Sequence, residues 1–467
     1  MRDDSGLNRS TIRYLMIYAV LVGLAIIVNL PGRAIGDSLD SLYQARRLDL
    51  LNSWHAPFVT FCYGLLSPLT GSPTGALVIQ SFLLMLWPAA IAARIIEAKL
   101  HETLRAVVFA AWSLVCMICI ALVGFIAKDF LLLGFMSAGL AAFTGHQSPR
   151  AKNNWSGLRV LWIVFCILAC CLVRPTNILV LGCAALLANF AARPSKRITQ
   201  RIANTGFMTV GIWIATTLVN SWFLPSIQFK PEKATIIFDI AGMSYYTGEN
   251  LLENASANLK PTHKIDDCYS SKQVDNWIWG ACQSDFYLLW EHLTPAFWAR
   301  MIAQHPYAYA RHRIAFIQHL LSMDKSITKM VAPPPPFKLA TNTAEHINEM
   351  EPEKRIAVQL WEPTIAYAPF GRIAHNTFRG PLGHPLTWIA LLALASISLF
   401  KLAPGDDKTL MAVMIAVGLG NVVMLAIFSP GDNLRYLLPT AFCALVVTVK
   451  FVELAARRWI PRREPLA

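Results

Sequence analysis

Residues 106–123 read AVVFAAWSLVCMICIALV and include no charged side chain. An apolar stretch of this length can satisfy its backbone groups in lipid only as a helix, so it predicts a transmembrane span. Working outward, nine further apolar runs occur, at 14–30, 75–93, 130–143, 160–173, 177–192, 204–222, 386–400, 410–428 and 437–454. The sequence therefore predicts an all-α polytopic membrane protein with about ten transmembrane helices. The shorter apolar run at 58–69 predicts a helix lying in the outer membrane interface, or a re-entrant segment.

The amino-acid composition also indicates a protein that is partly surrounded by lipid. Hydrophobic residues make up 55% of the 467 residues and charged residues only 15%, against about 25% charged in typical globular domains. A soluble chain has no means of burying that much apolar surface. The 41 Lys and Arg exceed the 28 Asp and Glu, giving a net charge of +13, a balance that nucleic-acid-binding proteins also show.

The distribution of the basic residues excludes a nucleic acid as partner and predicts the topology. With the N-terminus inside, 19 basic residues lie in the inner segments and 6 in the short outer ones. This asymmetry follows the positive-inside rule, so both termini are predicted to be cytoplasmic, in the inner membrane. The long segment 223–383 is balanced, with 15 basic and 15 acidic residues. We expect three parts: an N-terminal transmembrane bundle with the first outer loop (1–222), a mostly helical extracytoplasmic domain (223–383), and C-terminal transmembrane helices (384–467).

Eight of the ten cysteines lie in apolar segments, where cysteine behaves as a small hydrophobe. Cys268 and Cys282 differ, because both fall in the predicted extracytoplasmic domain, where oxidation is permitted. They form either a disulfide or two separate buried thiols. No His, Cys and carboxylate cluster has the spacing of metal ligands, although a divalent metal as cofactor stays open.

Ionisable residues are absent from the middles of the predicted spans, which argues against a proton-coupled pump. They collect instead at the predicted outer ends of four spans. The residues in these four connections are Asp37 and Asp40, Lys128 and Asp129, Arg174, and Asp432 and Arg435. Acids and cations on one membrane face predict an active site at the lipid–water boundary.

Asp37 and Asp40 follow the first span in the stretch Gly36-Asp37-Ser38-Leu39-Asp40. At i and i+3 the two carboxylates would share one helix face. A positioned carboxylate can act as a general base, and one member of a close pair binds protons more readily. The competing interpretation is a capping box with Asp37 at the N-cap and Asp40 at N3, and the two roles are compatible.

Three outer cations are candidates to bind a lipid phosphate. Arg435 and Arg174 can bind phosphate in a bidentate manner, whereas Lys128 acts as a point charge. Alternatively Lys128 pairs with Asp129, and Arg174, which precedes Pro175, marks a helix break. His55 is either an interfacial anchor or a substrate contact. Five further polar residues lie on or beside an amphipathic helix of the predicted extracytoplasmic domain and are expected on its solvated face: His305, Tyr307, Arg311, His312 and Arg313.

The order of these motifs resembles the GT-C membrane glycosyltransferases, the lipid-linked-sugar enzymes that include the protein mannosyltransferase and aminoarabinose transferase families. The matching segments are Gly36-Asp37-Ser38, Tyr43-Gln44-Ala45-Arg46, Trp54-His55-Ala56-Pro57, Leu69-Thr70-Gly71-Ser72, Lys128-Asp129, Arg174-Pro175-Thr176-Asn177 and Arg435-Tyr436-Leu437-Leu438-Pro439. They cover the spans and the first outer loop, about two-thirds of the chain. The adjacent Asp-Glu pair that is usual in the family is a spaced pair here.

The resemblance implies an inverting transfer of a sugar from a polyprenyl-phosphate donor to a glycan, lipid or protein acceptor on the outer face of the membrane. Asp37 would be the base, with Asp40 as the alternative. Arg435 would steady the departing lipid phosphate, together with Lys128 and Arg174. His55, Asp129 and Tyr436 would contact substrate.

Three other functions remain open from the sequence. A polysaccharide polymerase or ligase also uses lipid-linked glycans, but it would rely on outer-loop Arg and His residues. A noncatalytic lipid or solute transporter would show repeats or broken helices near mid-membrane, which the sequence does not contain. An envelope scaffold would tolerate loss of every polar residue named above.

Overall fold

The computed structural model describes residues 9–30, 32–34, 41–42, 44–45, 56–66, 72–97, 102–144, 157–192, 198–222, 230–255, 260–322, 372, 375–376, 379–399 and 406–459. Within these ranges the chain is helical apart from turns and two strands of two residues each. The predicted fold class is confirmed: this is an all-α polytopic membrane protein.

Within the described residues, each predicted apolar run is mostly helical. The helices are α1 (Arg9–Asn29), α5 (Ser72–Leu84) followed by α6 (Leu86–Glu97), α7 (Glu102–Val123), α8 (Lys128–Thr144), α9 (Gly157–Val173), α10 (Asn177–Ala192), α11 (Ile198–Trp222), α22 (Pro385–Leu399), α23 (Asp406–Phe428) and α24 (Leu438–Trp459). In the described ranges, six helical segments are long and apolar enough to cross a membrane. The total of ten spans stays a prediction.

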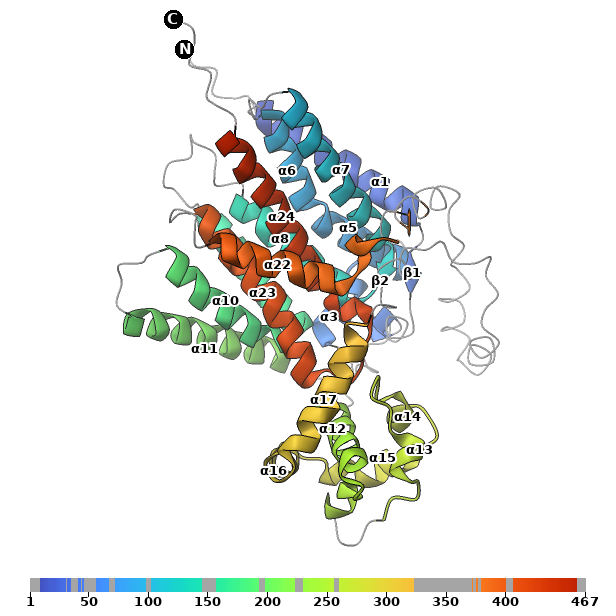
Figure 1. Cartoon of the computed structure of the whole chain (residues 1–467). Helices are drawn as coiled ribbons and strands as arrows, with labels where there is room; N and C mark the ends of the chain where they lie inside the picture. Colours follow the sequence, from blue (N-terminus) through green and yellow to red (C-terminus); the bar gives the residue numbers. More distant parts are fainter. Residues whose placement is uncertain are drawn as a thin grey trace, which may run out of the picture. The chain divides into compact units, whose positions relative to one another are not determined.

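The chain divides into two compact units. The first unit comprises residues 1–226, 326–419 and 438–467, and the second comprises 227–325 and 420–437. In the first unit α1, α6 and α7 pack against one another, and α24 packs on α7, α8 and α22 (Figure 1). The second unit therefore ends earlier than the predicted domain 223–383 and includes a segment from beyond it.

A short interruption between α5 and α6 shows how a proline is accommodated in an apolar helix. Pro88 has no N–H, so the Leu84 carbonyl lacks its helical donor. The Ser137 hydroxyl, from α8, donates to that carbonyl at 2.7 Å and accepts from the Trp87 N–H at 3.1 Å. A side chain on a neighbouring helix thus satisfies the backbone groups that the break exposes.

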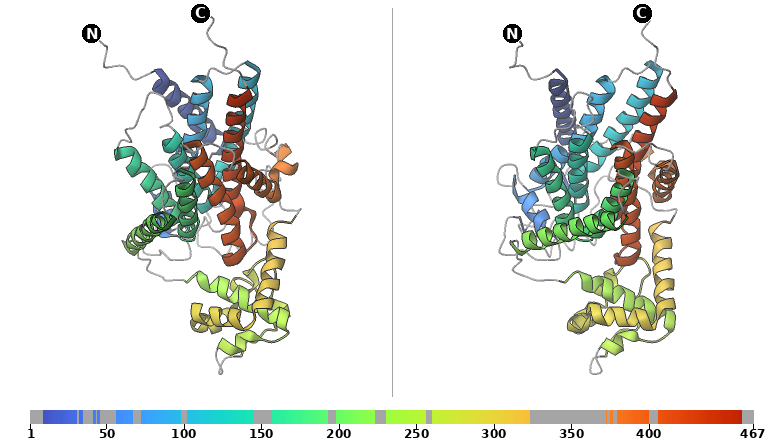
Figure 2. Two further views of the ribbon diagram at one scale, coloured as in Figure 1. Left: turned by 60° about the vertical axis from the view of Figure 1, so that its left-hand side comes forward. Right: turned by 90° about the vertical axis from the view of Figure 1, so that its left-hand side faces the viewer.

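The second unit is built from short helices. They are α12 (Glu232–Thr247), η3 (Leu251–Ala255), α13 (Ile265–Cys268), α14 (Asp275–Ile278), α15 (Gln283–Leu289), η4 (Trp290–His292), α16 (Pro295–Gln304), α17 (Pro306–Leu320) and η6 (Leu434–Leu437). Thr294 caps α16 by accepting the Phe297 N–H at 3.2 Å, and Pro306 opens α17. The two helices meet at a corner at His305, as the gold ribbons in Figure 2 show.

Cys268 and Cys282 form a disulfide, with their Cα atoms 5.8 Å apart. This confirms the first of the two predicted alternatives. The bond joins the end of α13 to the residue before α15, so it fixes the loop between them within the second unit.

Candidate functional site

The chain leaving α1 is fixed beside the chain leaving α7. Asn29, which is buried at the end of α1, donates its side-chain amide to the Ala25 carbonyl at 2.9 Å and to the Ile120 carbonyl at 2.7 Å. A Cβ at Gly124 would clash with the Asn29 side chain, so this approach requires glycine. These contacts join the ends of the first and third predicted spans, where the first and second outer connections begin.

A parallel strand pair continues this junction. β1 (Arg33–Ala34) pairs with β2 (Phe125–Ile126), with Arg33 opposite Phe125 and Ala34 opposite Ile126. In the sequence, Asp37 follows β1 by three residues, and Lys128 follows β2 by two. The pairing therefore brings the start of the first outer connection next to the residues that lead into Lys128 and Asp129.

The helix α3 (Pro57–Gly64) packs into the same region. Its Phe58, Val59 and Tyr63 are buried in a hydrophobic cluster that also includes Leu42 and Ile126. Gln80 of α5 donates to the Tyr63 hydroxyl at 3.5 Å and to the Phe125 carbonyl at 3.4 Å. The run that predicted an interfacial segment is thus a helix with one face in the core of the first unit, and its place in the membrane interface stays a prediction.

Asp129 lies in the first turn of α8 and is fully buried. Its carboxylate is 2.5 Å from the guanidinium of Arg174, which is 12% exposed and follows α9. The α8 N-terminus also favours a negative charge here. The turn that carries Arg174 is closed by the Asn177 side chain, which donates to the Cys170 carbonyl at 2.9 Å.

The partner of Asp129 distinguishes two of the sequence interpretations. Asp129 pairs with Arg174, and in the described part of the chain no ion pair includes Lys128, which is half-buried. Arg174 thus neutralises a buried carboxylate, while its predicted contact with a lipid phosphate stays a prediction.

Three of the predicted site residues, Asp37, Asp40 and His55, lie outside the described residues. Of the predicted substrate contacts, Asp129 is occupied by its ion pair, and Tyr436 is half-buried.

Arg435 and Tyr436 belong to the second unit, in the connection between α23 and α24. The Arg435 side chain is buried, with its guanidinium carbon 5.2 Å from the centre of the Tyr436 ring. Asn433 accepts the Arg435 N–H at 3.1 Å, and Asn421 of α23 donates to the Tyr436 carbonyl at 2.9 Å. These contacts fix the conformation of the turn that carries Arg435.

This connection is also tied to the loop after α13. The Val274 N–H donates to the Pro430 carbonyl at 2.9 Å, and the Asp432 N–H donates to the Lys272 carbonyl at 3.0 Å. The Arg313 guanidinium donates to the Ser429 carbonyl at 2.8 Å. The chain segment before Arg435 is therefore held by α17 and by the loop that the disulfide closes.

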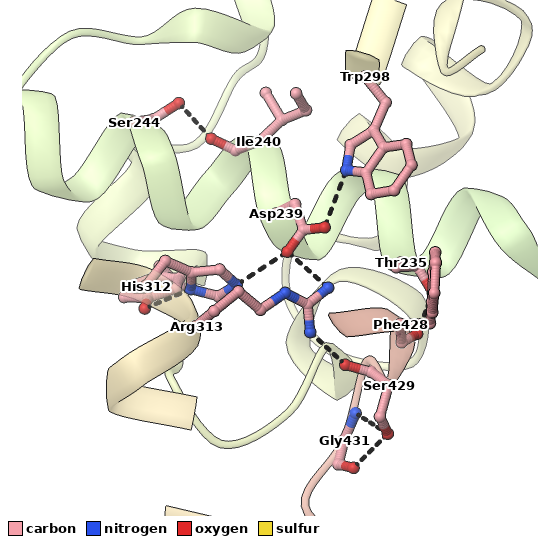
Figure 3. A network of polar contacts seen from close by, with 11 residues as sticks. Thr235, Asp239, Ile240, Ser244, Trp298, His312, Arg313, Phe428, Ser429 and Gly431 are labelled. Atoms are coloured by element: carbon pink, nitrogen blue, oxygen red, sulfur yellow. Dashed lines mark hydrogen bonds and ion pairs between the residues drawn. The ribbon is translucent and has the colours of Figure 1, made fainter. Parts of the chain in front are cut away.

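A buried polar network centres on Asp239 of α12 (Figure 3). The carboxylate accepts from the Trp298 indole N–H at 2.8 Å and lies 2.7 Å from the Arg313 guanidinium. His312 Nε2 is 3.1 Å from the same carboxylate, and His312 Nδ1 is 2.9 Å from the Tyr269 hydroxyl. Burial lowers the pKa of His312, and it outweighs the opposing effect of Asp239.

The expected solvated face was wrong for His312 and Arg313, which are 0% and 5% exposed. It was right for Tyr307 and Arg311, which are exposed, and His305 is half-buried. His312 belongs to a buried stripe of α17 with Ala308, Phe316 and Leu320. The i+4 spacing of these four residues was the sequence signal that could have revealed the burial.

No family model matches the sequence, and no curated protein matches it. Among solved structures, the chain is similar to the crystal structure of ArnT from Cupriavidus metallidurans bound to undecaprenyl phosphate. The sequence identity is 14%, the TM-score is 0.33, and the alignment covers 94% of this chain and 77% of that one. A TM-score of this size does not establish a shared fold.

Proposed function

We propose that this chain is a GT-C-like inverting glycosyltransferase that moves a sugar from a polyprenyl-phosphate donor to an envelope acceptor. Transfer would take place on the outer face of the cytoplasmic membrane, with both termini on the inner side. The observation that carries the proposal is the parallel pairing of β1 with β2. It supports a site in which the first outer connection, with its two carboxylates, adjoins the loop of Lys128.

The roles follow from the chemistry of a single displacement. Asp37, or alternatively Asp40, takes the proton from an acceptor hydroxyl as its oxygen attacks the anomeric carbon of the donor. The bond from that carbon to the lipid phosphate breaks, and the phosphate leaves as an anion. The resemblance gives Arg435 and Lys128 the role of stabilising the developing negative charge, because a cation near a departing phosphate lowers the barrier. Arg174 holds Asp129 in place and sets the position of Lys128 at the start of α8.

The test uses a strain that lacks the gene, complemented with the wild type or with Asp37→Asn, Asp40→Asn or Arg435→Gln. Lipid-linked sugars and envelope glycans are compared by mass spectrometry. We expect loss of the base to reduce transfer about 10²-fold or more, with accumulation of the lipid-linked sugar. Asp266→Asn, at an exposed carboxylate of the second unit, is the matched control and should retain activity. Full transfer by both Asp37→Asn and Asp40→Asn would disprove the mechanism.

A further inference from the structure

Four tyrosines and an arginine of the second unit, none of which has a role in the proposed mechanism, lie together. This tyrosine platform consists of Tyr245, Tyr246, Tyr269, Tyr307 and Arg311. The ring centres of Tyr245 and Tyr246 are 5.3 Å apart, and those of Tyr245 and Tyr269 are 4.8 Å apart. The Arg311 guanidinium lies 4.7 Å from the centre of the Tyr246 ring and 5.9 Å from that of Tyr307.

The platform presents its aromatic rings to solvent. Tyr245 is 49% exposed and Tyr307 is 75% exposed, while Tyr246 and Tyr269 are half-buried. Exposed aromatic groups that touch one another form an apolar surface with polar edges, which is typical of a binding site.

The surroundings fix one of the phenol groups in a defined orientation. His312 Nε2 faces the Asp239 carboxylate, which can only accept, so the imidazole proton is on Nε2. His312 Nδ1 is then an acceptor, and the Tyr269 hydroxyl donates to it. The Tyr246 side chain is also hydrogen-bonded to Tyr269, so these two phenol groups are held together. The disulfide at the neighbouring Cys268 holds Tyr269 in this position.

These features match the chemistry of a sugar chain. Sugar rings have an apolar C–H face that stacks on aromatic rings, and hydroxyls that bond to phenol oxygens. Arg311 is exposed and stacked on tyrosine rings, and within the described ranges it forms no ion pair with a carboxylate. A guanidinium in this state pairs well with a carboxylate or phosphate group of a ligand.

We propose that the tyrosine platform binds a glycan that carries acidic groups. Binding at this surface does not require sugar transfer, but the further step that the bound glycan is the acceptor rests on the proposed function. Loss of the platform would then weaken acceptor binding without removing the catalytic base.

The first test measures binding to the full-length protein in lipid nanodiscs, without donor. Oligogalacturonides are the acidic probe and malto-oligosaccharides are the neutral probe. Their binding is measured by calorimetry. Tyr245→Ala should raise the Kd for the acidic probe about tenfold, which corresponds to about 1.4 kcal/mol. Arg311→Gln should raise it for the acidic probe only. Tyr287→Ala is the matched control, because Tyr287 is also 49% exposed in this unit, and it should leave the Kd unchanged.

Three results would overturn the proposal. They are no saturable binding of the acidic probe, equal losses in Tyr245→Ala and Tyr287→Ala, and equal binding of both probes with no effect of Arg311→Gln. A nitroxide label at Tyr245→Cys provides a second measurement. The collision rates of the label with oxygen and with a soluble nickel complex are compared. A higher rate with oxygen would place the tyrosines in the membrane interface, and this result would also contradict glycan binding. Binding that persists in Asp37→Asn separates failure of the proposed mechanism from failure of the platform.

Discussion

Each unit contains a buried aspartate paired with an arginine, and the two pairs differ in their surroundings. Asp239 lies in the middle of α12, where Arg313, His312 and Trp298 all contact its carboxylate. Asp129 lies in the first turn of α8, next to Lys128 and three residues beyond the strand pair. The first pair is enclosed by the unit that it stabilises, whereas the second borders a candidate site. The same two residue types thus support a core in one unit and position a loop in the other.

The largest effect is expected at Asp239. Asp239→Ala leaves the buried Arg313 without its counter-charge, which should cost about 3–5 kcal/mol in the free energy of unfolding of the second unit. Thermal unfolding of the purified protein measures this loss. Asp266→Ala, at an exposed carboxylate, should leave the transition unchanged, and an equal loss in both variants would contradict the role of the network.

A smaller effect is expected at Arg174. Because the Arg174 side chain is 12% exposed, water partly screens its pair with Asp129, and Arg174→Met should cost about 2 kcal/mol. The same variant should also lower sugar transfer, since the start of α8 carries Lys128. Unfolding and transfer are measured on one preparation. If Arg174→Met has normal stability and normal sugar transfer, the ion pair between Arg174 and Asp129 does not set the position of Lys128.

Gly242→Ala tests how closely α12 approaches α17. A Cβ at Gly242 would clash with the imidazole ring of His312. Overpacking of this kind costs about 1–3 kcal/mol, and it should displace the hydrogen bond to Tyr269. Gly211→Ala of α11 is the control, because its Cβ meets no atom within 4 Å. The unfolding temperatures of the two variants are compared. Equal unfolding temperatures would contradict the close approach of α12 to α17.

The smallest effect is a dependence on pH. Burial lowers the pKa of His312 below the ordinary value of 6.5, so between these two values the unfolded chain binds more protons than the folded one. His312 therefore does not change the stability of the second unit with pH above about pH 6.5. As the pH falls below about 6.5, His312 lowers that stability. Unfolding temperatures at pH 7.5 and 5.5 should differ less in His312→Gln than in the wild type. An identical shift in both would rule out His312 as the titrating group.

Much of the fold follows from local sequence patterns. Apolar runs predict helices because a chain in lipid must satisfy its backbone groups within the helix itself, and α10 begins and ends at the predicted residues. The two cysteines of the predicted extracytoplasmic domain likewise form the disulfide that their compartment permits. These features depend on side-chain chemistry close to each residue.

The candidate site was less predictable, since its contacts join segments that are distant in sequence. Lys128 is the nearest cation to Asp129 along the chain, yet Arg174 is the residue that pairs with it. His312 and Arg313 have the polarity of surface residues, and only the packing of α17 on α12 buries them against Asp239.

The sequence alone thus determined where the helices form, which cysteines can join, and which polar residues were candidates. The tertiary structure decided which of those polar residues meet. Ion pairs, the β1–β2 pairing and the tyrosine platform depend on how helices pack, and packing is a property of long-range contacts that no local pattern encodes.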